Sequence, residues 1–362
     1  MIVPAPKKAT LSNLVYVGTY TRAGRSQGIY LFQQDPLSGK LTLMQSLAEA
    51  NPSFLTFSPD RRFLFAVSEG LGLNGGAVAS FTIDGPTGQL TPLSHQPSLG
   101  GEPCHLCCDP TGRWVLVANH EHGSVVVLPI DDDGRLGPVS HFQQHEGSGP
   151  GPTQAGPHAH WVDFDLPGRR VLVADKGIDK IMIYRLDADT GKLIPNEPAF
   201  GSLHAGAAPR HLAFHPSGRY AYVNGEADMT ITAFNYDAER GALDELQVLS
   251  TLPEGAPRDG CSTAEIVVEP AGRFVYVSNR GHDTIAIFGI DQATGLLTAA
   301  GHAPTQGRTP RNIAIDPTGT FLYAANQDSD TLVHFRIDHQ QGQLMPTGDV
   351  TRVGAPVCIL FG

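Results

Sequence analysis

Two motifs recur along this chain, and their regular spacing identifies it as a repeat protein. The first motif is a short apolar strand, a turn that resembles Pro-x-Gly-Arg, and a second apolar strand that ends in a polar residue. It occurs six times, at residues 54–68, 105–119, 160–175, 211–224, 265–279 and 312–326. Self-similarity at intervals of about 50 residues indicates that each repeat is one supersecondary unit that packs against its neighbours.

The second motif ends a third strand with Asp and begins a fourth strand just after Gly. Asp accepts hydrogen bonds from its own turn and Gly adopts a positive φ, which explains why these two residue types recur there. The motif occurs seven times, at Asp35/Gly39, Asp84/Gly88, Asp131/Gly134, Asp187/Gly191, Asp237/Gly241, Asp291/Gly295 and Asp338/Gly342. The two motifs together predict four antiparallel strands per repeat.

The chain ends explain why one motif has six copies and the other seven. Residues 356–361 have the pattern of a first strand without its second, and residues 14–20 that of a second strand without its first. Joined in space, they complete a seventh copy and pair sheet edges that would otherwise be exposed. We therefore predict an all-β fold: a single seven-bladed β-propeller domain over residues 1–362, with four-stranded antiparallel blades, 28 strands in all, and the last blade closed by both termini.

Composition excludes several classes of partner. The formal net charge of −11 argues against binding to nucleic acid or to an anionic membrane. No apolar run approaches the roughly 20 residues of a membrane span, and residues 1–13 lack the apolar stretch of a signal peptide, which predicts a cytoplasmic location. The five cysteines are irregularly spaced, so we expect no disulfide framework. Cys104 and Cys107 have the spacing of a redox pair but lie in a strand-like stretch, which favours a structural role.

Strand direction predicts which face of the propeller carries chemistry. The start of each first strand and the end of each second strand share one face. The Gly-Arg turns lie at the other face, so we expect turn and surface roles for Arg113, Arg169, Arg219 and Arg273. Polar and charged residues replace small or apolar ones at the shared face, and these are His105, His158, His160, Arg210, His211, Glu265, Arg311, Glu69, His120, Lys176, Glu226, Arg280 and Gln327. Their convergence predicts an anion site with a base inside it.

The chain resembles the lactonase propeller family, which includes propeller-type 6-phosphogluconolactonases and fungal carboxymuconate lactonizing enzymes. The resemblance is greatest in residues 209–226, PRHLAFHPSGRYAYVNGE, and extends to residues 16–21 (YVGTYT), 156–160 (GPHAH) and 279–280 (NR). It runs over essentially the whole chain. The resemblance implies a catalytic set of His160, Arg210, Glu226 and Arg280.

The family resemblance further implies hydrolysis of a sugar lactone, with 6-phosphogluconolactone as the expected substrate and the pentose phosphate pathway as its setting. Hydrolysis needs a base for the water, a positive group for the oxyanion and a holder for the substrate's anion. We expect Glu226 or His160 to be the base, and Arg210 and Arg280 to stabilise the oxyanion. The expected substrate-binding residues are His158, His105, Arg311 and Gln327. The expected partner is a small anionic lactone, with no cofactor.

Other interpretations remain open at this point. A muconate-type lactone cycloisomerase, a lyase, would use the same residues to move a proton without consuming water. A binding propeller would expose an apolar or aromatic patch, which the aromatic content of 7% does not favour. His158 and His160 are spaced like metal ligands, but no third ligand is visible, so no metal site is expected. Glu226 pairing with an arginine, and packing roles for His105 and His211, are the structural alternatives.

Overall fold

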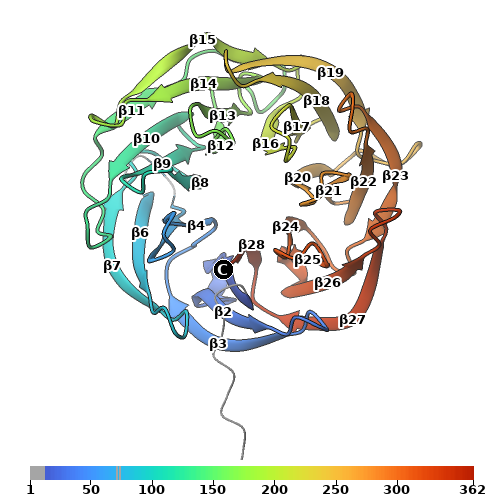
Figure 1. Ribbon diagram of the computed structural model, residues 1–362, viewed down its shortest axis with the longest axis horizontal. Helices are drawn as coiled ribbons and strands as arrows, with labels where there is room; N and C mark the ends of the chain where they lie inside the picture. The colour runs from blue at the N-terminus through green and yellow to red at the C-terminus, as the bar shows by residue number, and fades with distance from the viewer. Residues whose placement is uncertain (1–12, 71, 73–74) are drawn as a thin grey trace, which may run out of the picture.

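Seven four-stranded antiparallel sheets surround a central channel in the computed structural model (Figure 1). The structure describes residues 13–362 except Leu71, Leu73 and Asn74. Within these residues, the predicted seven blades and 28 strands are confirmed. The amino-terminal segment used to predict the location lies, apart from Asn13, outside the described residues. No described helix is long and apolar enough to cross a membrane.

Each blade runs from an innermost to an outermost strand. The innermost strands are β4 (Leu55–Phe57), β8 (Pro103–Cys108), β12 (Ala159–Phe164), β16 (Pro209–Phe214), β20 (Ser262–Val268), β24 (Pro310–Ile315) and β28 (Pro356–Phe361). The second strands are β5 (Phe63–Ser68), β9 (Trp114–Asn119), β13 (Val171–Asp175), β17 (Tyr220–Gly225), β21 (Phe274–Arg280), β25 (Phe321–Asn326) and β1 (Leu14–Thr19).

The two outer positions complete the blades. The third strands are β6 (Ala77–Ile83), β10 (Ser124–Pro129), β14 (Lys180–Leu186), β18 (Thr230–Asp237), β22 (Thr284–Ile290), β26 (Thr331–Ile337) and β2 (Gly28–Gln34). The outermost strands are β7 (Leu90–Pro97), β11 (His141–Gln144), β15 (Leu193–Ser202), β19 (Ala242–Ser250), β23 (Leu297–Pro304), β27 (Leu344–Arg352) and β3 (Leu41–Ala48). The described 3₁₀ helices are η2 (Arg22–Gly24) and η3 (Gln327–Ser329).

One blade is built from both ends of the chain, as predicted. Strand β28 pairs antiparallel with β1, with Val15 opposite Phe361 and Val17 opposite Ile359. The blade has the order β28-β1-β2-β3, and its red and blue strands lie together in Figure 1. This pairing closes the ring and joins the inner edge of β1 to the last strand of the chain.

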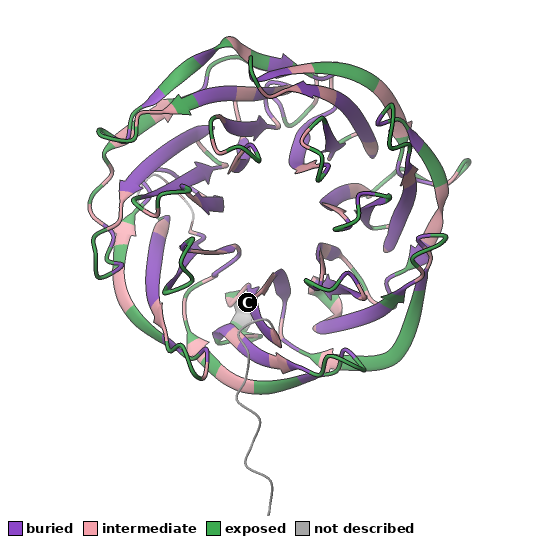
Figure 2. Ribbon diagram, in the orientation of Figure 1, coloured by how far each residue is buried: buried purple, intermediate pink, exposed green. Residues whose placement is uncertain are grey.

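The core lies between neighbouring blades. Second strands pack on both faces, so β5 is buried at all six positions, whereas the outermost strand β3 is mostly partly or fully exposed (Figure 2). The two sequence motifs also contact each other across blades. The hydroxyl of Tyr16 donates to the carbonyl of Gly88 in the next blade at 2.6 Å, and Gly88 adopts a φ of 73° in its turn. Tyr222 and Tyr276 donate likewise to Gly295 and Gly342, both at 3.0 Å.

The starts of first strands and the ends of second strands lie at one face, as predicted. The residue that follows a second strand donates its backbone N–H to the residue that precedes the first strand. This bond joins Glu226 to Ala208 at 2.9 Å and Lys176 to His158 at 3.0 Å. Because the backbone already fixes this position, the side chain there is free to vary from blade to blade and to point toward the channel mouth.

Candidate active site

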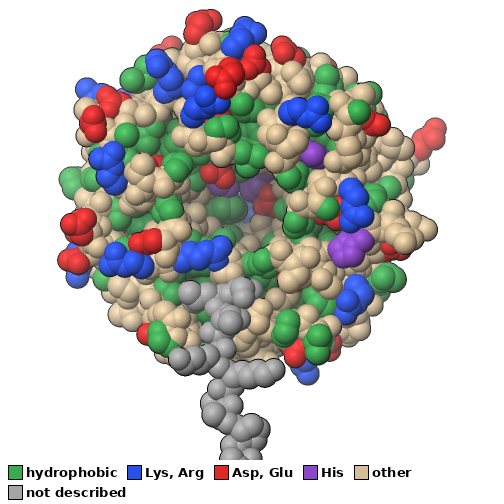
Figure 3. All heavy atoms as spheres, in the orientation of Figure 1, with side chains coloured by type: hydrophobic (Ala, Val, Ile, Leu, Met, Phe, Trp, Pro, Cys, Tyr) green, Lys and Arg blue, Asp and Glu red, His purple; other side chains and the backbone are tan. Residues whose placement is uncertain are grey.

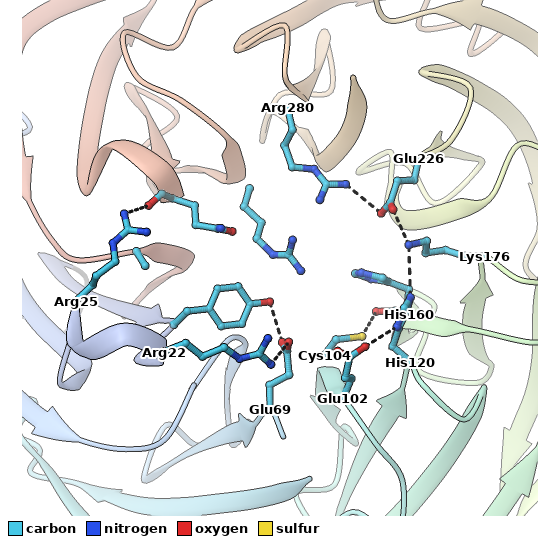
Figure 4. A pocket seen from close by; sticks show the side chains of 14 residues that line it. Arg22, Arg25, Glu69, Glu102, Cys104, His120, His160, Lys176, Glu226 and Arg280 are labelled. Atoms are coloured by element: carbon cyan, nitrogen blue, oxygen red, sulfur yellow. Dashed lines mark hydrogen bonds and ion pairs between the residues drawn. The ribbon is translucent and has the colours of Figure 1, made fainter. Parts of the chain in front are cut away.

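A pocket of about 540 Å³ lies at the channel mouth on this face (Figure 4). Fourteen residues of the described part of the chain line it, and half of them occupy one repeated position, at or just after the end of a second strand. These residues are Tyr20, Glu69, His120, Lys176, Glu226, Arg280 and Gln327. Each blade therefore contributes one side chain to the rim of the pocket.

A second set of side chains enters the channel from β-bulges near the starts of inner strands. The pairing register shifts at His160 in β12, at Arg210 in β16 and at Arg311 in β24. Cys104 occupies the same position in β8. A bulge inserts one extra residue and redirects its side chain, so the repeat directs these residues inward from equivalent positions in their blades.

The carboxylate of Glu226 is surrounded by cations from three blades. Its Oε1 lies 2.6 Å from Lys176 Nζ, and its Oε2 lies 3.0 Å from Arg210 Nε and 3.1 Å from Arg280 Nη2. Figure 4 shows Arg280 and Lys176 converging on this carboxylate. Burial raises the pKa of Glu226, but Lys176, Arg280 and Arg210 outweigh burial and hold the pKa well below its ordinary value. Glu226 is therefore ionised and weakly basic.

Arg210 lies deeper than the other predicted catalytic residues. It is 3% exposed and lines a small chamber of about 10 Å³ below the pocket rather than the pocket itself. Its Nη1 donates to the carbonyl of Ala264 at 2.5 Å, and burial lowers its pKa to about 10. Arg210 therefore contacts Glu226 from below and does not line the pocket, whereas Arg280 contacts Glu226 and also lines the pocket.

Two groups in the pocket lack polar partners among the described residues. The Nδ1 atom of His160 is buried without a hydrogen bond. The guanidinium of Arg311 stacks 5.3 Å from the ring of Tyr20 and has no carboxylate partner in the described part of the chain. Burial and the charges of Arg210 and Lys176 lower the pKa of His160 well below its ordinary value. The pocket thus holds a neutral imidazole and, among the described residues, an unpaired cation.

The opposite side of the pocket carries its own network. The hydroxyl of Tyr20 donates to Glu69 at 2.9 Å, and Arg22 Nη2 lies 3.3 Å from the same carboxylate. Arg25 reaches Asp330 at 2.6 Å at the mouth. Among the described residues, five cationic side chains and three carboxylates line the pocket. The pocket of this acidic chain is therefore a local cationic site suited to an anion.

The other predicted substrate-binding residues divide into two groups. Gln327 lines the pocket. His158 does not, because its Nδ1 bonds to the carbonyl of His120 at 2.9 Å and its ring stacks on that of His120. His105 lies below the pocket, with its ring centroid 3.9 Å from that of Phe54. Their positions in the repeat predicted the correct face, but the packing of neighbouring rings turns both imidazoles away from the pocket.

Several lining residues were absent from the predicted site set. The repeat position of Lys176 and Glu69 predicts that they lie at this face but indicates no role for either. Tyr20 occupies the same position in the blade closed by the termini, so completing the repeat there would have found it. Arg22 and Arg25 lie in and beside η2, which belongs to neither motif. No sequence signal marks them.

The cysteines and histidines form neither disulfides nor metal clusters within the described residues. All five cysteines are free thiols. Burial raises the pKa of Cys104, which lines the pocket, to about 12. No group of three His, Cys, Asp or Glu side chains in the described part of the chain has the arrangement needed to hold a metal ion.

The channel is also hollowed at the face that carries the carboxyl terminus, shown in Figure 3. Charged side chains are scattered over this face, and charged and histidine side chains are also visible at depth inside the opening.

Comparisons with known proteins identify the family. The model of the seven-bladed β-propeller lactonase family matches residues 14–361. A Bacillus subtilis protein named 6-phosphogluconolactonase is 39% identical over 284 residues, which cover 78% of this chain and 79% of that protein. A Pectobacterium carotovorum protein of the same name is 34% identical over 287 residues, covering 78% and 80%.

A solved structure agrees with this assignment. The structure of a Pseudomonas aeruginosa protein named periplasmic gluconolactonase has a TM-score of 0.91 and 34% sequence identity, and the alignment covers 96% of this chain and 98% of that one. The fold, the family match and these relatives agree, and the chain belongs to the lactonase family of seven-bladed β-propellers.

Proposed function

We propose that this protein hydrolyses a sugar lactone, most specifically 6-phosphogluconolactone to 6-phosphogluconate. The observation that carries the proposal is that one cationic pocket holds both a neutral imidazole, His160, and a guanidinium, Arg311, that has no carboxylate partner among the described residues. Lactone hydrolysis needs a group that accepts a proton and a group that receives negative charge, and these two residues are chemically available for both roles.

The proposed reaction begins with a water held beside His160. His160 accepts a proton from this water as the oxygen attacks the lactone carbonyl carbon, and the carbonyl oxygen becomes negative beside Arg311 and Arg280. When the intermediate collapses, the bond from carbonyl carbon to ring oxygen breaks, and the ring oxygen takes the proton from the imidazole. The product is an open-chain hydroxy acid, which ionises in the cationic pocket.

Glu226 serves this reaction as an electrostatic anchor rather than as the base. Three cations occupy its two oxygens, so neither oxygen is free to accept a proton from water. By holding Lys176 and Arg280 at fixed places, it presents positive charge to the pocket without reorganisation during the reaction.

Arg22 and Arg25 are the proposed contacts of the phosphate. Both line the mouth of the pocket, and their side chains are 50% and 36% exposed, so a substrate that spans the pocket from base to mouth would place its anion beside them. One relative is named a 6-phosphogluconolactonase and another a gluconolactonase, and the substrates in these names differ in the phosphate. Recognition of the phosphate is therefore the feature to test. A cytoplasmic location and a role in the pentose phosphate pathway belong to the same proposal.

The test is the disappearance of freshly generated 6-phosphogluconolactone, measured against its spontaneous hydrolysis. We expect clear acceleration by the wild type, little by His160→Gln, and incorporation of labelled solvent oxygen into the product. Conversion of a muconate-type lactone without oxygen incorporation would instead support the cycloisomerase. A wild type that accelerates neither reaction would contradict an enzymatic role in lactone chemistry.

A further inference from the structure

We propose that Glu265 and His211 form a buried dyad that positions Arg210 beneath the pocket and, through Arg210, the carboxylate of Glu226. This inference rests on the function proposed above. Glu265 lies in β20, and His211 and Arg210 lie in β16 of the neighbouring blade. The three residues are 7%, 3% and 3% exposed. They are positioning residues, because they act on the pocket through Glu226.

The contacts form a continuous chain toward the pocket. Glu265 Oε1 lies 2.7 Å from His211 Nδ1, and His211 Nε2 lies 3.1 Å from Arg210 Nη1. Arg210 Nε then lies 3.0 Å from Glu226 Oε2. A buried carboxylate is thereby linked to the rim of the pocket through one imidazole and one guanidinium.

The chemistry of these side chains fixes the direction of both hydrogen bonds of His211. A guanidinium only donates, so His211 Nε2 must accept from Arg210. The proton of the neutral imidazole is then on Nδ1, which donates to Glu265. Burial and the charge of Arg210 keep His211 neutral by lowering its pKa well below the ordinary value. The lone pair of His211 faces Arg210 rather than the pocket, which distinguishes it from His160.

Every other partner of Glu265 also donates. Asn312 Nδ2 lies 2.5 Å from Glu265 Oε2, and the backbone N–H of Ile266 donates to Oε1 at 3.1 Å. The amide of Asn312 cannot turn over, because its Oδ1 accepts the backbone N–H of Ile359 at 3.0 Å. A carboxylate satisfies all three donors, whereas a glutamine would place its own N–H₂ against one of them. The site is therefore built for a negative charge.

The dyad restricts the orientation of Arg210. The guanidinium is tied to Ala264, His211 and Glu226 at once, so it cannot rotate without breaking one of these contacts. Glu226 in turn holds Lys176 and Arg280. Charges that must be aligned with a developing oxyanion affect the transition state more than substrate binding, so loss of the dyad should lower kcat more than it raises KM.

The dyad also predicts a pH dependence with a defined sign. The titratable and charged groups that influence Glu265 are His211 and Arg210 from β16, His105 from β8 and Cys358 from β28. Burial raises the pKa of Glu265 to about 7. Below this pH it gains a proton, one donor contact is lost, and kcat should fall to a lower plateau. His160 stays neutral there, because its pKa is lowered, so kcat should not fall to zero.

The first experiment compares the wild type with Glu265→Gln. We expect kcat for 6-phosphogluconolactone to fall about 10- to 100-fold with KM within about threefold, and the step near pH 7 to disappear. His215→Gln is the matched control, because His215 is a buried histidine directly after strand β16 but contacts Ser217 and Gly272 at the opposite face. An unchanged kcat and pH profile in Glu265→Gln would overturn the proposal.

The second experiment does not depend on activity or on the folding of the Glu265→Gln variant. Nitrogen-15 NMR of the wild type, with the His211 signals identified by comparison with His211→Gln, should show a proton on Nδ1 and an unprotonated Nε2. A proton on Nε2 would overturn the dyad whether or not the protein hydrolyses lactones. Absence of lactone hydrolysis by the wild type, together with the expected tautomer, would contradict the proposed function and leave the buried contacts supported.

Discussion

The two ends of the channel carry arginines in opposite settings. At the turn end, the side chains of Arg169 and Arg273 are both 45% exposed, and each pairs with a surface or turn carboxylate. At the site end, the side chains of Arg210 and Arg280 are 4% and 16% exposed and share Glu226. The expected turn and surface roles of the first pair agree with these contacts. The same residue type therefore has a different function at each end of one repeat.

The difference comes from what the backbone requires at each end. At the turns, an acidic side chain is used to hold the loop: Asp109 accepts the backbone N–H of both Arg113 and Trp114 at 2.7 Å. Asp165 does the same for Arg169 at 2.7 Å. At the site end, the residue at or just after the end of a second strand has its backbone N–H satisfied by another backbone group, as in the bond from Glu226 to Ala208. The side chain at this position is not needed to hold the loop, so each blade can supply a different functional group there.

The strongest test of this contrast is the replacement of His160. His160→Gln should lower turnover about 10²- to 10⁴-fold, because the proposed base is lost while the shape of the side chain is largely kept. The measurement is kcat for 6-phosphogluconolactone beside the control His215→Gln, which alters a histidine at the turn end. Turnover within a few fold of the wild type in His160→Gln would remove His160 from the mechanism.

The next largest effect is expected at the shared carboxylate. Glu226→Gln should lower turnover at least about 100-fold, because the cations of Lys176, Arg210 and Arg280 lose their common partner and repel one another. Stability should also fall, by about 3–5 kcal/mol, since breaking a largely buried ion pair leaves charges uncompensated. Kinetics and denaturant unfolding measure the two effects. Full activity with reduced stability would make Glu226 purely structural.

A smaller effect at the mouth would sharpen the boundary of the site. Replacing Arg22 and Arg25 together by Gln should raise KM for the phosphorylated lactone about three- to tenfold and weaken the dependence of KM on salt, because exposed charges are screened. KM for unphosphorylated gluconolactone serves as the control and should change less. Equal changes for both lactones would mean that these arginines do not recognise the phosphate.

The smallest effect is expected at the turn end. Arg169→Gln removes an exposed pair with Glu239 at 2.9 Å and should leave the midpoint of thermal unfolding nearly unchanged, with no change in kcat, because solvent screens exposed ion pairs. Thermal unfolding and the lactone assay check both statements. A large loss of activity would show that the turn end of the channel influences the site end.

Part of the site could be predicted because the place of a residue in the repeat gives its position along a strand. His160, Arg210, Glu226, Arg280 and Arg311 break the apolar pattern at the face where strands begin and end, and the structure brings them around the channel. The depth of Arg210 and the outward turn of His158 could not be predicted, since both depend on contacts with residues of neighbouring blades. Arg22 and Arg25 could not be predicted because η2 follows no repeat.

The sequence by itself determined the blade count, the closure by both termini and the face that carries the functional side chains. These features follow from strand periodicity and from turn residues, and both recur in every repeat. Only the tertiary structure decided which charges are paired. Glu226, Lys176 and Arg280 come from three different blades. Glu265, His211 and Asn312 also come from three different blades. Ion pairing and proton affinity depend on distances of about 3 Å across blade boundaries, which no periodicity within one blade specifies.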